Sequence, residues 1–346
     1  TAGQWNDLTH TTQFSTTQTG MHSVLGYVRE TNLGNSPLTV NAGTGAVAFG
    51  GAVGGSKALA SLNVSAASTV VNGNALVTSG TQTYNNSLTV NASGDLNVSA
   101  SSLSITNPNQ GQLLKAAGSV LPKQGMNVST NGGHVVYWAD SDGNGTGAIE
   151  VKNATIATNG GGIWMGGGIG STVWTPRSGA TSITVGNGMA RSVGGLGPAL
   201  NLDNATLTAG AGNIYLAGQS GATSTNHGIG VRLFGLSTVL SGADITLEGI
   251  GSASSGSYAN HWGVSMESSS KITASGQLRI TGTGGGGNSG GGSNRGVYLS
   301  NASLASSGAM TINGTGGGKS GDSGGNDGIH MTGATQIQSG AAALTL

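Results

Sequence analysis

The chain has 346 residues, of which 67 are glycine, 4% are aromatic and only 7% are charged. An ordinary globular domain has about 25% charged residues and many more large side chains, so this composition excludes one wide core and favours a thin core repeated many times. Twelve basic residues balance twelve acidic ones without any basic run, which argues against nucleic acid as a partner. No apolar run approaches the roughly 18 residues of a membrane span, and the absence of cysteine excludes disulfides and thiolate metal sites.

Residues 1–37 are the least periodic part of the chain and are predicted to form an irregular or distorted N-terminal coil. From residue 38 to residue 131, pairs of apolar residues recur with one residue between the members of each pair. This alternation is typical of strands with one buried face. The short and unequal intervals between successive pairs predict a β-helix with short, uneven coils, and the pairs are Leu38/Val40, Leu62/Val64, Leu88/Val90 and Leu103/Ile105.

The segment DSDGNG holds the most chemically suggestive pattern of side chains. Asp140, Asp142 and Asn144 alternate along it, as oxygen ligands do in the first half of a Ca²⁺-binding loop. The bidentate acid that such a loop needs later is absent at the right distance, and Glu150 alone is a weak substitute. Two interpretations stay open, a Ca²⁺ site and a solvated turn, and the missing acid favours the turn.

From residue 132 to residue 346 the apolar pattern repeats evenly, about once every 32 residues, and predicts that the same solenoid continues with regular coils. One row of apolar pairs recurs once per period: Ile183/Val185, Ile214/Leu216, Ile245/Leu247, Leu278/Ile280, Met310/Ile312 and Leu344/Leu346. A second row keeps the same period: Leu200/Leu202, Val231/Leu233, Val264/Met266, Val297/Leu299 and Ile329/Met331. A third, looser row consists of Leu207, Val239, Ile272, Leu304 and Ile337.

Three short strands per period and no amphipathic helical window predict an all-β fold of stacked coils. A coil of about 32 residues is too long for a hexapeptide-type prism, so the predicted fold is a right-handed parallel β-helix. One Gly-rich loop per coil, beginning at Gly249, Gly282 and Gly314, is predicted to leave the solenoid on one side. Asparagines near the ends of these loops predict a structural ladder of stacked side chains: Asn226, Asn260, Asn294 and Asn326.

Short matches to catalytic motifs carry little weight in this chain. GNSGG (287–291) and GDSGG (321–325) resemble nucleophile segments, but they occupy equivalent places in consecutive Gly-rich loops, so low complexity explains both. Aligned by the period, Asp244 and Glu248 meet no acidic partner in the neighbouring coils, which disfavours a carboxylate-pair glycosidase. No catalytic residue is therefore predicted.

The chain contains several Asn-X-Ser/Thr sequons, and the candidate glycosylation sites among them include Asn63, Asn91, Asn97, Asn127, Asn153, Asn204 and Asn301. Several recur at coil corners, where turn geometry by itself favours asparagine. The five tryptophans could stack on sugar rings, although their scattered positions favour local packing.

Three passages carry a resemblance to a known family: GGHVVYWADSDGNGTGAIEVKNATIATNGGGIWMGGG (132–168), the segment from Gly50 to Val90, and the later GVYLSNASLASSGAMTINGTGG coils. They resemble the repeat region of filamentous haemagglutinin-like exoproteins, large bacterial surface proteins exported by two-partner secretion. The resemblance implies a right-handed β-helical shaft, an extracellular location at the bacterial surface, and a role in adhesion or surface filaments. NPNQ at Asn107 is similar to a motif of the family's secretion domain, but the rest of that domain is not evident.

The sequence thus predicts a non-enzymatic structural segment, an adhesive shaft or an extracellular filament, without a required cofactor. The expected partners are copies of the chain, or further coils of the same polypeptide, stacked end to end. The alternatives are a glycan-binding surface on the long loops, which would recognise host or matrix glycans, and a polysaccharide-degrading enzyme.

Overall fold

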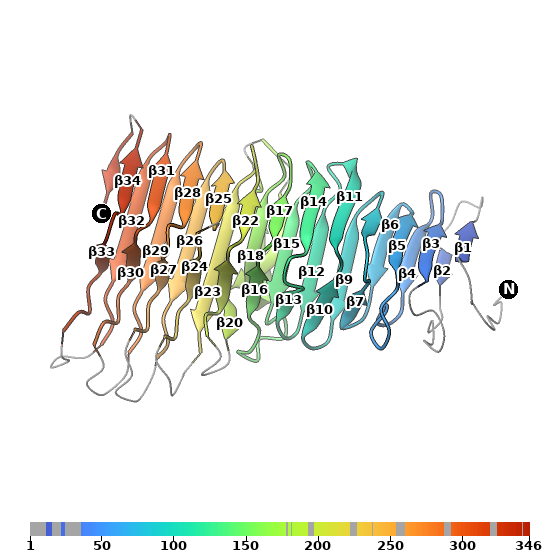
Figure 1. Cartoon of the computed structure of the whole chain (residues 1–346), viewed down its shortest axis with the longest axis horizontal. Helices are drawn as coiled ribbons and strands as arrows, with labels where there is room; N and C mark the ends of the chain where they lie inside the picture. Colours follow the sequence, from blue (N-terminus) through green and yellow to red (C-terminus); the bar gives the residue numbers. More distant parts are fainter. Residues whose placement is uncertain are drawn as a thin grey trace.

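The computed structural model describes residues 12–15, 22–24, 36–177, 179–180, 182–192, 197–221, 227–236, 238–253, 260–286, 292–318, 324–340 and 342–346. These residues form three stacked sheets, here named A, B and C, and they include no helix long and apolar enough to cross a lipid bilayer. The strands β1 to β4 alternate between A and B, and from β5 onward the chain visits A, B and C in turn. Each strand pairs with its counterparts in the neighbouring coils. Figure 1 shows the strands side by side along the whole stack.

The strand bounds are as follows. Sheet A contains β1 (Thr12–Ser15), β3 (Pro37–Asn41), β5 (Ser61–Ser65), β8 (Gln82–Tyr84), β11 (Ser102–Pro108), β14 (Asn127–Asn131), β17 (Thr155–Ala157), β22 (Thr206–Thr208), β25 (Val239–Gly242), β28 (Lys271–Ala274), β31 (Ser303–Ser306) and β34 (Gln336–Ser339). Sheet B contains β2 (His22–Val24), β4 (Ala46–Phe49), β6 (Ser68–Val71), β9 (Leu88–Ala92), β12 (Gln112–Ala116), β15 (Val135–Ala139), β18 (Ile163–Trp174), β23 (Ile214–Ser220), β26 (Ile245–Ile250), β29 (Leu278–Thr283), β32 (Met310–Thr315) and β35 (Leu344–Thr345), with β19 (Ile183–Gly188) and β20 (Ala190–Ser192) attached to it. Sheet C contains β7 (Ala75–Val77), β10 (Leu96–Ser99), β13 (Val120–Pro122), β16 (Ile149–Lys152), β21 (Leu200–Asp203), β24 (Val231–Phe234), β27 (Val264–Met266), β30 (Val297–Ser300) and β33 (Ile329–Thr332).

The pairing between coils is parallel throughout this path, which is the architecture of a parallel β-helix. Inward side chains stack on their counterparts one coil away and form one continuous hydrophobic core. In sheet B the predicted row from Ile214 through Ile245, Leu278 and Met310 to Leu344 is confirmed as one column of register partners. In sheet C the row from Leu200 to Ile329 is confirmed in the same way.

Three details of the predicted rows are wrong. In sheet A, Leu240 and not Val239 is the inward residue, since Leu240 pairs with Leu207 and Ile272 and is fully buried. Leu88 belongs to sheet B, whereas the other pairs with which the sequence aligned it belong to sheet A. The counterpart of Ile214 in the preceding coil is Ile163 and not Ile183.

Ile183 and Val185 lie instead in β19, which runs antiparallel to the second half of β18. We call residues 168–177 and 182–188 the flap. The flap packs on outward-facing residues of sheet B and forms a second hydrophobic cluster apart from the main core, whose buried members are Val136, Trp138, Trp164 and Val185. The insertion explains why this coil is longer than the others.

Two facing columns of glycine mark the crossing from sheet B to sheet C. Gly249 and Gly263 belong to these columns, and their backbones approach each other so closely that a Cβ on Gly249 would overlap the backbone carbonyl of Gly263. Equivalent contacts recur at Gly282 with Gly296 in the next coil. These recurring glycines are therefore required by close backbone approach.

Candidate functional site

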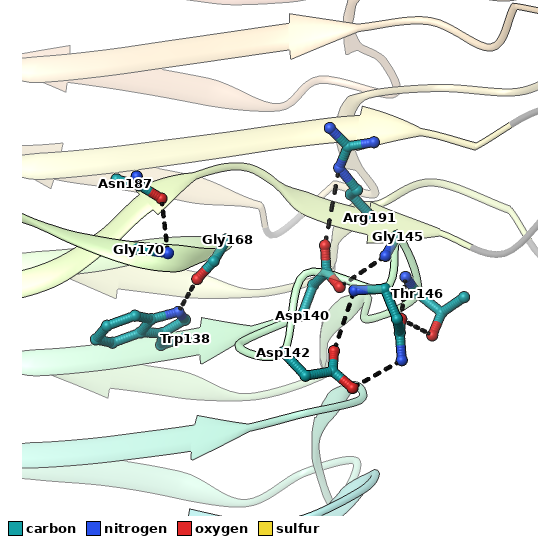
Figure 2. Close-up of polar contacts among 10 residues, drawn as sticks. Trp138, Asp140, Asp142, Gly145, Thr146, Gly168, Gly170, Asn187 and Arg191 are labelled. Atoms are coloured by element: carbon teal, nitrogen blue, oxygen red, sulfur yellow. Dashed lines mark hydrogen bonds and ion pairs between the residues drawn. The ribbon is translucent and has the colours of Figure 1, made fainter.

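The DSDGNG segment is a turn between β15 and β16 that an arginine from the next coil holds in place. Asp140 has a positive φ of 49° and is only 1% exposed. Its carboxylate accepts a hydrogen bond from the Gly145 N–H at 3.0 Å and lies 3.8 Å from Nε of Arg191 (Figure 2). The backbones of Arg191 and Gly147 also exchange two hydrogen bonds. The turn is thereby tied to the segment that carries β20.

The remaining oxygens of the predicted Ca²⁺ ligand set take part in hydrogen bonds within the turn. Asp142 accepts hydrogen bonds from both the backbone N–H and the side-chain Nδ2 of Asn144, at 3.2 and 2.8 Å. Oδ1 of Asn144 in turn accepts the N–H of Thr146 at 2.8 Å. Burial raises the pKa of Asp140, and the bonds from Gly145 and Thr146 and the charge of Arg191 oppose that rise. These contacts are those of a polar turn that is hydrogen-bonded within itself and to Arg191 of the next coil.

The Ca²⁺ prediction at Asp140, Asp142 and Asn144 stays a prediction. Within the described ranges, no group of three or more histidine, aspartate or glutamate side chains lies where it could hold a metal ion. The asparagine amide and backbone carbonyls would have to complete any such site. Calcium titration of the chain, followed by its melting temperature, tests the point directly.

Of the predicted asparagine ladder, Asn294 and Asn326 are joined, by a bond from a backbone N–H to a side-chain oxygen. The backbone N–H of Asn294 donates to Oδ1 of Asn326 in the next coil at 2.9 Å, and the N–H of His261 donates to Oδ1 of Asn294 at 3.1 Å. The N–H of Gly228 donates in the same way to Nδ1 of His261 at 3.2 Å. The column is therefore Gly228, His261, Asn294 and Asn326.

Asn260 lies one position earlier, in the column of His227 and Ser293. His227, Asn260 and Ser293 all have positive φ, between 64° and 67°, so this column is a repeated left-handed corner. Asn226, the fourth predicted member of the ladder, lies outside the described residues. The sequence aligned the asparagines by residue type, and the column proves to be defined by a side-chain acceptor, a role that histidine also fills.

His261 fills this role only in its neutral form. Its Nδ1 accepts a hydrogen bond from a backbone N–H, so Nδ1 cannot itself carry a proton. The side chain is fully buried, and burial, assisted by the nearby His227, lowers the pKa of His261. A second histidine uses the same device, because Nδ1 of His134 accepts the N–H of Gly162 at 3.0 Å and burial lowers its pKa too.

Aromatic side chains form a second ladder on the outer side of sheet C. Trp262 and Tyr298 have ring centroids 4.3 Å apart, and the ring of His330 lies 5.8 Å from that of Tyr298. Arg295 covers Tyr298 at 4.9 Å and pairs with Asp327 at 3.5 Å. Because the rings lie against one another along the stack and Trp262 is only 7% exposed, this ladder joins coils and leaves little ring face for a sugar.

The carboxylates on the outer faces have individual polar partners. Glu267 pairs with Arg232 at 3.2 Å, Glu248 accepts a hydrogen bond from the Tyr215 hydroxyl at 2.8 Å, and Asp244 accepts the N–H of Gln277 at 2.8 Å. The register confirms that Glu248 stacks between Ala217 and Thr281, so no second acid adjoins it in those coils. These contacts are structural links within and between coils.

The sequons fall mainly on exposed surface. Of the seven candidate asparagines proposed above, Asn204 is half-buried and six are exposed: Asn63, Asn91, Asn97, Asn127, Asn153 and Asn301. Asn153, Asn204 and Asn301 share one corner, between sheets C and A, where each has a φ of 48–51°. Glycosylation stays a prediction, and mass spectrometry of the native protein would test it.

Part of the Gly-rich loops lies beyond the structural description. GNSGG (287–291) falls outside the described residues, and of GDSGG only Gly324 and Gly325 are included. The central residues of the loop that begins at Gly249, 254–259, are also outside. Glycan binding by the loop tips therefore stays a prediction.

Comparison with known proteins gives no relative. No family model, no curated protein and no solved structure matches the chain. Function is therefore inferred from the fold and from the contacts described above.

Proposed function

We propose that the chain is a non-enzymatic shaft segment of a large secreted or cell-surface protein, of the filamentous haemagglutinin-like kind, that forms an adhesive shaft or an extracellular filament. The proposal includes a right-handed path of the solenoid, Gly-rich loops on one side, and end-to-end continuation by further coils of the polypeptide or by a second copy. The observation that carries it is the unbroken stack. Sheets A and B run from coil to coil along the described chain, sheet C joins them from β7 onward, and one core fills the interior.

The outer contacts support a mechanical role. Side-chain bridges between neighbouring coils recur on different faces, as in the Arg232–Glu267 pair and the His261–Asn294 bond. Each bridge adds to the backbone ladder that already joins the two coils, so tension along the axis is shared among many weak links. A hydrolytic role has less support, because the outer carboxylates described above are individually engaged.

Electron microscopy of the native polypeptide, purified from its source, tests the shaft proposal. Long rods of uniform width are expected, whereas compact particles without a rod would overturn the proposal. A glycan array and a panel of polysaccharide substrates complete the test. Selective binding that disappears when residues 254–259 and 287–291 are shortened would transfer the function to the loops, and turnover of a polysaccharide would establish an enzyme.

A further inference from the structure

The outer face of sheet A differs from the other outer surfaces in its side chains. One column of register partners crosses eleven successive strands, from β3 to β34, and consists of small or uncharged polar residues: Thr39, Asn63, Thr83, Ser104, Ser129, Ala157, Thr208, Ser241, Thr273, Ala305 and Gln338. None of these residues is buried. The face is thus a regular array of hydroxyl, amide and methyl groups.

Charge is almost absent from this face. Among the outward positions of the eleven sheet A strands from β3 to β34, Lys271 is the one charged residue. The outer side of sheet C, in contrast, carries ion pairs such as Arg232–Glu267, and that of sheet B carries the flap and Arg279. Of the three described faces, sheet A is therefore the one that a flat partner can approach with a single charged side chain, that of Lys271, in the contact.

A second copy of the same chain matches this face in chemistry, repeat and area. Hydroxyl and amide groups both donate and accept hydrogen bonds, so the face is complementary to itself. Two copies share the same spacing of about 4.8 Å between strands, and their rows can interdigitate as small polar side chains do between paired sheets. Eleven strands stack over a height of roughly 50 Å, and each strand is about 15 Å long. The face therefore has an area of roughly 700 Å², close to the ~800 Å² that each partner buries in a stable complex.

We propose that two copies of the chain associate side by side, with sheet A of one copy packed against sheet A of the other. The two solenoid axes then run along each other, so the pair is twice as thick as one copy and about equally long. Because the contact contains few charges, salt weakens it little. This lateral pairing is independent of the shaft function proposed above and differs from end-to-end stacking.

Charged substitutions at the centre of the face test the pairing. In the full chain, the double variant Ser129→Glu/Thr208→Glu places two carboxylates on exposed outward positions of β14 and β22. Burying unpaired carboxylates in the contact is unfavourable, so the dissociation constant of the dimer, from sedimentation equilibrium, should rise at least about tenfold. The matched control is Asn97→Glu/Asn313→Glu, with the same added charge on exposed positions of sheets C and B, and it should leave the constant unchanged.

Small-angle scattering of the same samples separates lateral from end-to-end association. The expected dimer has an almost unchanged maximum dimension and a larger cross-section. Circular dichroism melts of both variants confirm that the fold survives. A wild-type chain that stays monomeric at all concentrations, a dimer of doubled length, a dimer that resists the sheet A substitutions, or equal loss in the control would each overturn the pairing.

Discussion

Asn301 shows how one residue type serves a corner of the solenoid. Its φ of 51° turns the chain from sheet C into sheet A, and its Oδ1 accepts the N–H of Ala334 in the next coil at 2.9 Å. The same corner holds Gly235 and Gly333, which reach positive φ without a side-chain penalty. The Asn-Ala-Ser/Thr spacing follows from this geometry, since the alanine that comes next, Ala302, is buried and the serine begins a strand.

Substitutions of Asn301 should separate the backbone effect from the hydrogen bond. Asn301→Ala loses both the residue type that tolerates a positive φ and the side-chain hydrogen bond, and it should lower the free energy of unfolding by roughly 1–3 kcal/mol. Asn301→Gly loses only the side-chain bond and should cost less, and Asn301→Asp keeps the acceptor oxygen. Denaturant unfolding measures the order. Equal losses in the alanine and glycine variants would contradict a role for the left-handed conformation.

His261 should make the stability of the chain dependent on pH. The pKa of His261 is lowered in the folded state, so between neutral pH and the folded pKa the unfolded chain binds a proton that the folded chain does not. The contribution of His261 to the free energy of unfolding should therefore be fully present above about pH 6.5, the usual pKa of histidine, and should be lost as the pH decreases below that value.

The variant His261→Asn tests this coupling, because it places at position 261 the residue type found at Asn294 and Asn326 in the same column. It should keep an acceptor for the Gly228 N–H and give a shallower loss of unfolding free energy between pH 7 and pH 5 than the wild type. His134 remains in both proteins and accounts for a residual slope. Identical slopes in both proteins would show that His261 does not couple to folding.

At the scale of elements, the flap is the main departure from a uniform coil. Trp138 donates from Nε1 to the carbonyl oxygen of Gly168 at 2.8 Å (Figure 2). Within the flap, Val185 is fully buried, whereas Val173 is 71% exposed. Trp164 stacks on Tyr215 with ring centroids 6.1 Å apart. The flap is held by its own small cluster, so it should detach without loss of the main core.

Val185→Asp should release the flap while the solenoid stays folded. A buried unpaired carboxylate is incompatible with the second cluster. Tryptophan emission should shift to the red and protease cleavage in the flap should accelerate, while the far-ultraviolet melt changes little. Val173→Asp is the matched control and should change none of these signals. Cooperative unfolding of the whole chain by Val185→Asp would contradict the independence of the flap.

The elements show which parts of the fold are accessible from sequence. The rows of apolar pairs after Ile214 repeat with little variation, so periodicity alone gives their register. Ile183 and Val185 have the same alternation and stand before Ile214 at the same interval as the regular pairs, yet they bury against tryptophans outside the core. Alternation reports that one face of a strand is buried but not which surface buries it, and for this reason the flap was not predictable.

The whole molecule should tolerate the loss of a complete coil. Removal of residues 245–277 deletes one full period and brings Leu278 into the position of Ile245, next to Ile214. All three sheets keep their order, so the shortened chain should fold with a somewhat lower melting temperature and a length reduced by about 4.8 Å. Circular dichroism and small-angle scattering measure both quantities.

A deletion of half a coil is the control for this experiment. Removal of residues 245–260 eliminates β26 but leaves β27, so β27 of sheet C would follow β25 of sheet A directly, and this coil would supply no strand to sheet B. This variant should fail to form the full stack. If both deletions were equally harmful, the coil would not be the unit of stability.

Side-chain links across coils were only partly accessible from sequence. The Asn294–Asn326 bond follows a visible repeat, but the participation of His261 depends on which atom accepts the hydrogen bond, and residue identity does not show this. The contact of Arg191 with Asp140 joins residues on either side of the flap and has no periodic counterpart. Contacts that break the repeat require the structure, since a repeat provides no signal for them.

Near-identical rungs create an ambiguity for a folding chain, because a strand that pairs one rung out of step still buries its aliphatic residues. The flap removes that ambiguity at one place. If the chain slipped by one rung there, Trp164 would lose Tyr215 and Asp140 would lose Arg191, and no other described rung offers the same pair of partners. The coil that carries the flap thus provides a unique reference point, from which the coils described on either side can pair in the correct register.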